Sequence, residues 1–228
     1  MKLLAIETAT EACSAAVLID GEIQQRYQVA PREHGNLILG MIDELMADAQ
    51  LSVSQLDAIA FGRGPGSFIG VRIAAGVTQG IAYGGDLPVI PVSTLATIAQ
   101  GTDHNHLLVA IDARMDEVYW GQYSRSPDSN TMVECVPELL ISPIEVTVQD
   151  ADKHWVAVGS GWETYRESLL RRLKVVQHID DHHLPMAKCT AILAEELYQR
   201  GQLVAAAEAI PVYLRDRVAE KPKKNSGT

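Results

Sequence analysis

The stretch with the strongest suggestion of chemistry is GRGPGSFIG at residues 62–70, where a glycine-rich turn joins an apolar segment to a helix-like one. A strand, such a turn and a helix N-terminus together form an anion site in many proteins, because free backbone N–H groups and the positive helix end point the same way. A P-loop requires lysine after its last glycine, whereas Gly66 is followed by Ser67 and Phe68. The glycine spacing also differs from the dinucleotide fingerprint. A sharp strand-to-helix turn is therefore favoured over phosphate binding.

A second group of candidate ligands is the polar segment QHIDDHHLP. Its adjacent histidines lack the i, i+4 spacing of helical metal ligands, and a polar turn before proline favours a solvated loop over a metal centre. An adventitious metal at this loop stays open, and two further histidines, in the segment between the halves of the chain, need no other role than as loop residues. The histidines and aspartates concerned are His178, Asp180, Asp181, His182, His183, His104 and His106.

Catalytic sets of other kinds are incomplete in this sequence. Asp112, Asp116 and Glu117 flank a strand end, where acidic pairs can do acid/base work, but no nucleophile or matched base accompanies them. Ser67 and Ser160 each lie beside glycines, yet neither stands in the G-x-S-x-G pattern of a serine hydrolase. We therefore assign no catalytic, metal-binding or cofactor-binding residue from the sequence.

Composition indicates an ordinary globular protein with one domain or two small ones. The 228 residues are 47% hydrophobic and 21% charged, which is enough to bury a core, and the formal charge is −10. An acidic chain does not have the basic surface that nucleic-acid binding needs, so any RNA contact is expected to require a partner. Cys13, Cys135 and Cys189 form no C-x-x-C pair, and no apolar run is long enough for a signal peptide or membrane span. A cytoplasmic location without membrane attachment is expected.

Hydrophobic periodicity predicts an α/β fold for the first half. Residues 2–6, 13–19 and 22–29 resemble successive strands of a β-meander, with Asp20-Gly21 at the second turn. Amphipathic or apolar helices are predicted over 34–50 and 68–83, the latter capped by Ser67. A strand before each of the next helices, and Ser93 as a further cap, complete the order βββαβαβα, which is typical of a mixed sheet covered by helices.

The second half repeats this theme more loosely. Strands are predicted in LLVAIDA, DEVYWGQY and WVAVGSG, helices in WETYRESLLRRL and AKCTAILAEELYQRG, and a surface turn in SRSPDSN. We divide the chain into an N-terminal lobe at 1–103, a C-terminal lobe at 104–216 and a polar tail at 217–228 that is expected to be flexible.

The helix predicted over 68–83 is unusually apolar. Between Ser67 and Gly85 its only charged residue is Arg72, and Gly76 and Gly80 share one face, so another backbone can approach there. A helix this poor in polar residues must be covered on most sides, either within its own domain or by a partner. The residues alone leave these two possibilities open.

Five segments together resemble the TsaB (YeaZ-type) family, namely LLAIETATEACSAAVL, GRGPGSFIGVRIAAGVTQGIA, PVSTLATIA, DARMDEVYWGQY and PVYLR. The resemblance runs nearly end to end, although Ile69 replaces the threonine common in that family's motif. It implies an actin/hexokinase/Hsp70-like (ASKHA) fold of two βββαβα-type lobes. It also implies a non-catalytic subunit in the formation of threonylcarbamoyladenosine (t6A) beside the tRNA anticodon.

The implied partners are TsaD, which is similar but larger and catalytic, and the ATPase TsaE, with tRNA reached only through the complex. TsaD carries an H-x-x-x-H metal motif, whereas here His34 is followed four residues later by Ile38. Nucleotide-binding relatives place aspartate and glycine where this chain has Glu7 and Thr8, so no cofactor is expected and ATP or ADP binding would be weak.

By the same resemblance, the N-terminal helices pair with TsaD, or with a second copy when the protein is alone. The alternative is a stand-alone nucleotide-binding enzyme or ATPase of the same fold class. The residues predicted at the partner interface are Leu37, Ile38, Met41, Leu45, Ile69, Ile73, Gly76, Val77 and Gly80.

Overall fold

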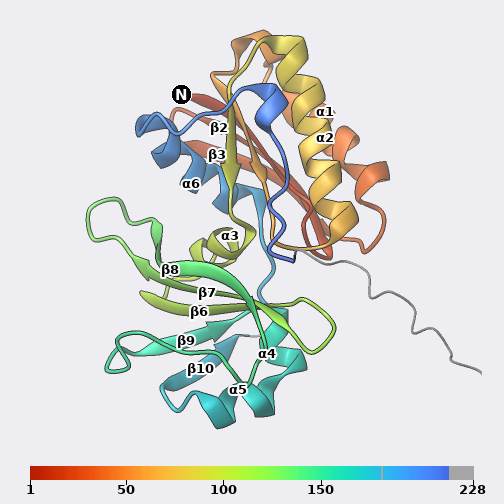
Figure 1. The fold of residues 1–228 in the computed structure, drawn as a ribbon. Helices are drawn as coiled ribbons and strands as arrows, with labels where there is room; N and C mark the ends of the chain where they lie inside the picture. The colour runs from red at the N-terminus through yellow and green to blue at the C-terminus, as the bar shows by residue number, and fades with distance from the viewer. Residues whose placement is uncertain (181, 216–228) are drawn as a thin grey trace, which may run out of the picture.

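The computed structural model describes residues 1–180 and 182–215 and contains two five-stranded mixed sheets, one in each lobe (Figure 1). The first sheet has the strand order β3-β2-β1-β4-β5. Its first three strands pair antiparallel as the predicted meander, and β4 and β5 add in parallel on the other side of β1. The strands are β1 (Lys2–Glu7), β2 (Ala12–Ile19), β3 (Glu22–Val29), β4 (Ala58–Gly62) and β5 (Val89–Val92).

The second sheet repeats this topology with the order β10-β9-β6-β7-β8. Here β6 is the central strand, β7 and β8 extend the meander on one side, and β9 and β10 add in parallel on the other. The expected α/β fold with two related lobes and mixed sheets is thus confirmed. The strands are β6 (His106–Asp112), β7 (Val118–Arg125), β8 (Met132–Ile141), β9 (Trp155–Val158) and β10 (Val176–Asp180).

Two strands of the second sheet were not predicted, and both lie at its edges. The segment containing His178 and Asp180 was interpreted as a loop, but it forms β10 and pairs with β9. Strand β8 contains Pro137 and several exposed residues and pairs only with β7. Edge strands carry polar residues and proline because one side of their backbone faces solvent. That is why neither strand has a recognisable apolar pattern.

Helices cover both faces of each sheet. The outer face of the first sheet is covered by α1 (His34–Asp48) and α2 (Phe68–Gly85), and the outer face of the second by α4 (Ser160–Thr164) and α5 (Arg166–Arg172). The expected caps are present, because the side chains of Ser67 and Ser93 accept hydrogen bonds from the backbone N–H groups of Gly70 and Ala96. Two short 3₁₀ turns, Val53–Gln55 and Ala206–Glu208, complete the described structure.

The two lobes exchange their last helices. Helix α3 (Thr94–Gln100) follows the first sheet in sequence but packs its Leu95, Ile98 and Ala99 against the second sheet. Helix α6 (Ala187–Gln199) follows the second sheet but packs against the first. Figure 1 shows α3 between the lobes and α6 beside β2 and β3. Strands β1–β5 precede residue 104 and β6–β10 follow it, whereas residues 187–199 pack on the first sheet. The division of the chain into domains at residues 103 and 104 stays a prediction.

No helix within residues 1–180 and 182–215 is long and apolar enough to cross a membrane. The predicted tail at 217–228 lies outside the described residues.

The helix exchange predicts that the lobes unfold together. All three tryptophans lie in the second lobe, so their fluorescence reports on that lobe. Leu193 on α6 is buried against the first sheet, and Leu193→Ala should lower the free energy of unfolding by about 2–4 kcal/mol. Urea unfolding followed by tryptophan fluorescence should show this loss in full, in one transition, although the substitution is in the other lobe's core.

The control is Lys188→Ala, which removes an exposed side chain from the same helix and should leave the midpoint unchanged. A normal tryptophan transition for Leu193→Ala, alongside a destabilised first lobe, would show that the lobes unfold independently.

Candidate functional site

The glycine-rich loop is filled by the protein's own β1–β2 turn. A Cβ atom on Gly66 or Gly70 would lie too close to the carbonyl oxygens of Ala9 and Thr8, and one on Gly62 would overlap the carboxylate of Glu7. The turn is also bonded to α2, because the Ser67 N–H donates to the Ala9 carbonyl oxygen at 2.7 Å. The glycines therefore make room for a neighbouring backbone, which agrees with the interpretation as a sharp strand-to-helix turn.

Glu7 is the buried carboxyl group at the centre of this contact. Its Oε1 accepts the Ala9 N–H at 2.8 Å, and the Thr94 hydroxyl lies 3.5 Å from Oε2. Burial raises the pKa of Glu7 from 4.5 to about 7, and the hydrogen bonds from Ala9, Thr94 and Thr8 oppose this rise. In addition, the Thr8 hydroxyl donates to the Gly70 carbonyl oxygen at 2.8 Å. The hydrogen bond from Thr8 therefore holds the end of β1 against α2, and the side chain of Glu7 is enclosed in this contact.

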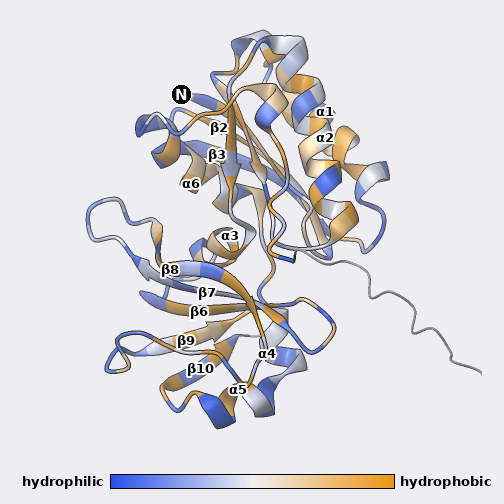
Figure 2. Ribbon diagram, viewed as in Figure 1, coloured by the Kyte–Doolittle hydropathy of each residue, from blue (hydrophilic) through white to orange (hydrophobic). Residues whose placement is uncertain are grey.

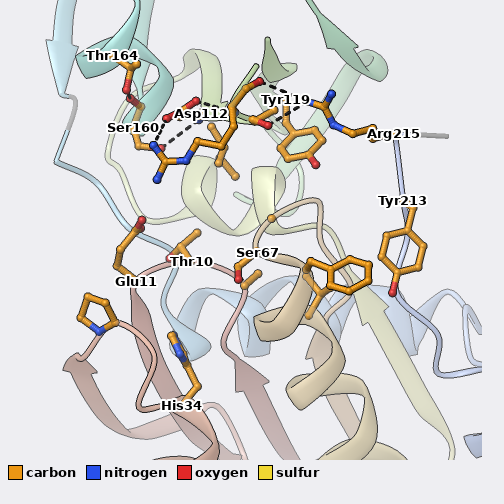
Figure 3. Close-up of a pocket in the computed structure, with 18 of the residues that line it drawn as sticks. Thr10, Glu11, His34, Ser67, Asp112, Tyr119, Ser160, Thr164, Tyr213 and Arg215 are labelled. Carbon is orange, nitrogen blue, oxygen red and sulfur yellow. Dashed lines mark hydrogen bonds and ion pairs between the residues drawn. The ribbon is translucent and has the colours of Figure 1, made fainter. Parts of the chain in front are cut away.

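A cleft of about 750 Å³ lies between the lobes, and Figure 3 shows the side chains that line it. The first lobe contributes the β1–β2 turn and the starts of α1 and α2, with Thr10, Glu11, His34 and Ser67 on that side. The second lobe contributes the end of β6 and the start of α4. Both walls combine charged and hydroxyl groups with apolar side chains, as many small-molecule sites do.

The second-lobe wall is organised around Asp112, one of the acidic residues noted at a strand end. Its carboxylate accepts hydrogen bonds from the backbone N–H and the guanidinium of Arg114, each at 2.8 Å, and from the Tyr165 hydroxyl at 3.3 Å. Its own backbone N–H donates to Ser160 Oγ at 3.2 Å. Asp112 therefore positions the loop after β6, and its lone pairs are largely occupied by the protein itself.

Residues 114–116 form a strained turn beside this wall. Arg114, Met115 and Asp116 all have positive φ angles, of 61°, 56° and 57°. Such angles are costly for side chains other than glycine and persist only where surrounding contacts impose them. The contacts come from Arg215, which pairs with Glu117 at 2.6 Å and donates to the Ala113 carbonyl oxygen at 3.0 Å.

The segment 211–215 connects the two walls of the cleft. The Val212 N–H donates to the Arg63 carbonyl oxygen in the glycine loop at 2.8 Å. Tyr213 lies 6.1 Å from the ring of Phe68, and the guanidinium of Arg72 stacks on Phe68 at 3.3 Å. Sequence reasoning assigned no role to these residues, since the only signal was the short PVYLR motif. Their partners are distant in sequence and come together only in the fold.

The outer face of α1 and α2 is open to solvent. Ile69 is 69% exposed and Leu39 is 55% exposed, and a Cβ atom on Gly76 or Gly80 would meet no atom within 4 Å. Tyr83 near the end of α2 is also exposed. Figure 2 shows hydrophobic residues on both helices, on the side of the lobe away from α6. We call this surface the α1–α2 face; it is formed by the exposed and partly exposed residues among 37–41 and 69–84 of the two helices.

Two residues predicted at the partner interface do not lie on this face. Ile38 and Leu45 are fully buried and pack in the core beneath α1, against the first sheet. The helical pattern identified them as apolar but did not distinguish the core side from the outer side. The other predicted interface residues are exposed or partly exposed on α1 and α2, and their role in an interface stays a prediction. They are Leu37, Met41, Ile69, Ile73, Gly76, Val77 and Gly80.

The histidine-rich segment is dispersed along the second sheet's edge. His178 lies 6.2 Å from His104 between ring centroids, and His183 Nδ1 lies 3.4 Å from the Asp180 carboxylate. Among residues 1–180 and 182–215, no three His, Cys, Asp or Glu side chains are grouped so that they can hold a metal ion. Asp181 lies outside the described residues.

Comparisons with known proteins identify the family. Residues 21–223 match the family model described as TsaD: tRNA N6-adenosine threonylcarbamoyltransferase. The curated tRNA threonylcarbamoyladenosine biosynthesis protein TsaB of Escherichia coli is 40% identical over 97% of both chains. This chain belongs to the TsaB family. The TsaB of Haemophilus influenzae is likewise 40% identical, over 97% of this chain and 96% of its own.

A solved TsaB-family structure confirms the fold. The structure of YeaZ from Pseudomonas aeruginosa matches with a TM-score of 0.88 and 42% identity, over 93% of this chain and 99% of the other. The resemblance to the TsaB (YeaZ) family and the expected two-lobed α/β fold with mixed sheets are therefore both confirmed. The match to the TsaD description indicates that TsaB shares this architecture with that enzyme family.

The packing around α2 predicts that alanine has opposite effects on the free energy of unfolding at Gly70 and at Gly80. Gly70→Ala should destabilise the protein by about 1–3 kcal/mol, because its Cβ would push against the Thr8 backbone. Gly80→Ala should stabilise it by about 0.5–1 kcal/mol, because the site is an open helix surface. Urea unfolding of dilute protein measures both, and equal effects at the two sites would contradict the packing.

The buried Glu7 predicts a specific pH dependence. Because the folded-state pKa is raised, its contribution to stability is full below about pH 4.5 and is lost as pH rises through about 7. Each unit of pKa difference corresponds to about 1.4 kcal/mol, so the loss is on the order of 3 kcal/mol. As the pH rises from 4.5 to 8, the free energy of unfolding of Glu7→Gln should increase by this amount relative to that of the wild type. Urea unfolding at each pH measures this difference. The exposed Glu163→Gln serves as the control, and parallel curves for all three proteins would contradict the prediction.

Proposed function

We propose that this TsaB-family protein is the non-catalytic partner of a TsaD homologue in the threonylcarbamoylation of adenosine beside the tRNA anticodon. A TsaE homologue joins the larger complex, and tRNA is reached only through that complex. The names of the curated relatives place them in threonylcarbamoyladenosine biosynthesis. The structure of this chain bears on a narrower question, which is whether the protein acts as a partner or as the catalytic subunit.

The observation that carries the proposal is the α1–α2 face. Glycines at 40, 76, 80 and 84 leave open space over both helices, so the backbones of a second helix pair can approach closely. Exposed Leu39, Ile69 and Tyr83 supply apolar surface around these glycines. An exposed surface of this composition on a small protein is typical of an interaction site.

The filled glycine loop supports a role without independent catalysis. The carboxylate of Glu7 and the carbonyl oxygens of Thr8 and Ala9 lie where an incoming phosphate would approach the turn, and all three repel an anion. The net charge of −10 similarly favours tRNA contact through the complex over direct binding. When no TsaD is present, the same face is expected to pair two copies of the chain.

Gly76→Glu tests this surface directly. The substitution places a charge at an open position of the α1–α2 face, where pairing would bury it without a partner at a cost of several kcal/mol. We expect co-purification with the TsaD homologue to fall at least tenfold, and the isolated variant to sediment as a monomer where the wild type is a dimer. Met41→Asp should act in the same way from α1.

The matched control is Gln199→Glu, which adds the same charge at an exposed position of α6 and should pair normally. Thermal unfolding verifies that each variant is folded. Normal pairing by both Gly76→Glu and Met41→Asp would reject the surface. Turnover of ATP by the purified chain alone would instead favour the alternative, a stand-alone ATPase of this fold class.

A further inference from the structure

We propose that the first-lobe wall of the interlobe cleft, at the starts of α1 and α2, is a binding site for a small oxyanion, a carboxylate or a phosphate. The site would be formed by the imidazole of His34, the guanidinium of Arg32 and the uncapped N-terminus of α1. This inference concerns the isolated chain and does not rest on pairing with TsaD.

His34 provides the observation that points to a ligand. Its side chain is only 6% exposed, and its buried Nε2 has no hydrogen-bond partner among residues 1–180 and 182–215. Burying such a group unpaired costs about 1–3 kcal/mol, so a group of this kind normally has a partner. The residue lines the cleft, and Figure 3 shows its ring extending from the base of the cavity towards Thr10. The unsatisfied nitrogen is buried at the base of the cleft, so a ligand would contact it after a small rearrangement of the ring.

Two helices begin beside this imidazole. Helix α1 has 15 residues and no side-chain cap at its N-terminus, and α2 has 18 residues and begins at Phe68, also on the cleft wall. The helices are neighbours at this end, because a Cβ atom on Gly35 would lie 3.9 Å from Ile73 Cδ1. The positive end of α1 therefore faces the cleft, which favours an anion there, whereas the start of α2 is already occupied by the carbonyl oxygens of the β1–β2 turn.

Arg32 adds a full positive charge to this wall. It is exposed, lines the cleft, and its guanidinium makes no hydrogen bond or ion pair with the described residues. Its φ angle is 71°, a left-handed conformation that costs an arginine about 1 kcal/mol. A guanidinium without another partner beside the N-terminus of α1 is well suited to a carboxylate or phosphate.

Acidic residues on the cleft define where the anion would lie. Glu11 and Glu163 are exposed on its walls, and Asp112 is already bonded to Arg114 and Tyr165. Glu11 lies on the first-lobe wall and Glu163 on the second, so an oxyanion is favoured only at the part of the base formed by His34, Arg32 and the start of α1.

The test is an NMR titration of the histidine side chains in the full chain, with inorganic phosphate and, separately, acetate as probes. Ionic strength is kept constant with sodium chloride. His34→Gln assigns the His34 signal by its disappearance. We expect a saturable shift of the His34 imidazole with at least one anion and no shift of exposed His178, which lies on the edge strand β10. Arg32→Gln should weaken the binding about tenfold, by loss of a charge-assisted hydrogen bond.

Lys188→Gln is the charge-matched control, since it removes an exposed positive charge from α6 and should bind as the wild type does. Thermal unfolding without added anion verifies the fold of each variant, and added phosphate should raise the Tm of the wild type more than that of His34→Gln. If neither anion shifts His34 in a saturable way, or if Arg32→Gln binds as tightly as Lys188→Gln, the site is rejected.

Discussion

The close contact between the β1–β2 turn and the start of α2 is the constraint on which the first lobe depends. The carbonyl oxygens of Thr8 and Ala9 lie so near Gly70 and Gly66 that no side chain fits at either glycine. Two hydrogen bonds, from Ser67 to Ala9 and from Thr8 to Gly70, fix the turn against the helix. The orientation of α2, and with it the α1–α2 face on its far side, follows from this contact.

The same contact changes the chemistry available at the turn. A glycine-rich loop before a helix is suited to phosphate when its backbone N–H groups face an open space. Here that space is taken by acceptor groups, including a carboxyl whose pKa is raised by burial. The glycine-rich loop therefore serves to pack α2 against the β1–β2 turn.

The two lobes are coupled by more than the chain that connects them. Helices α3 and α6 each pack on the sheet of the other lobe, and the segment 211–215 joins the glycine loop to the strained turn at 114–116. At the end of α2 that faces the cleft, the guanidinium of Arg72 stacks on the ring of Phe68. The ring of Tyr213 lies beside both groups. The cleft therefore lies at the N-terminal end of α2, and the α1–α2 face lies along the exposed side of the same helix.

The sequence by itself determined the local elements with strong periodicity or clear caps. The β-meander, the two apolar helices and the caps at Ser67 and Ser93 were predictable, because apolar spacing and capping residues act within a few positions. The short motifs were also sufficient to identify the family. The edge strands β8 and β10 were missed, because strands with one unpaired side lack a distinct apolar pattern.

Only the tertiary structure decided which apolar residues lie inside and which groups meet. Ile38 and Leu45 have the same helical pattern as Leu37 and Met41, and packing against the sheet assigned the first pair to the core. The pairing of Arg215 with Glu117, the unpartnered nitrogen of His34 and the exchange of α3 and α6 join residues far apart in sequence. Such contacts depend on how the sheets and helices pack in space, which no spacing along the chain encodes.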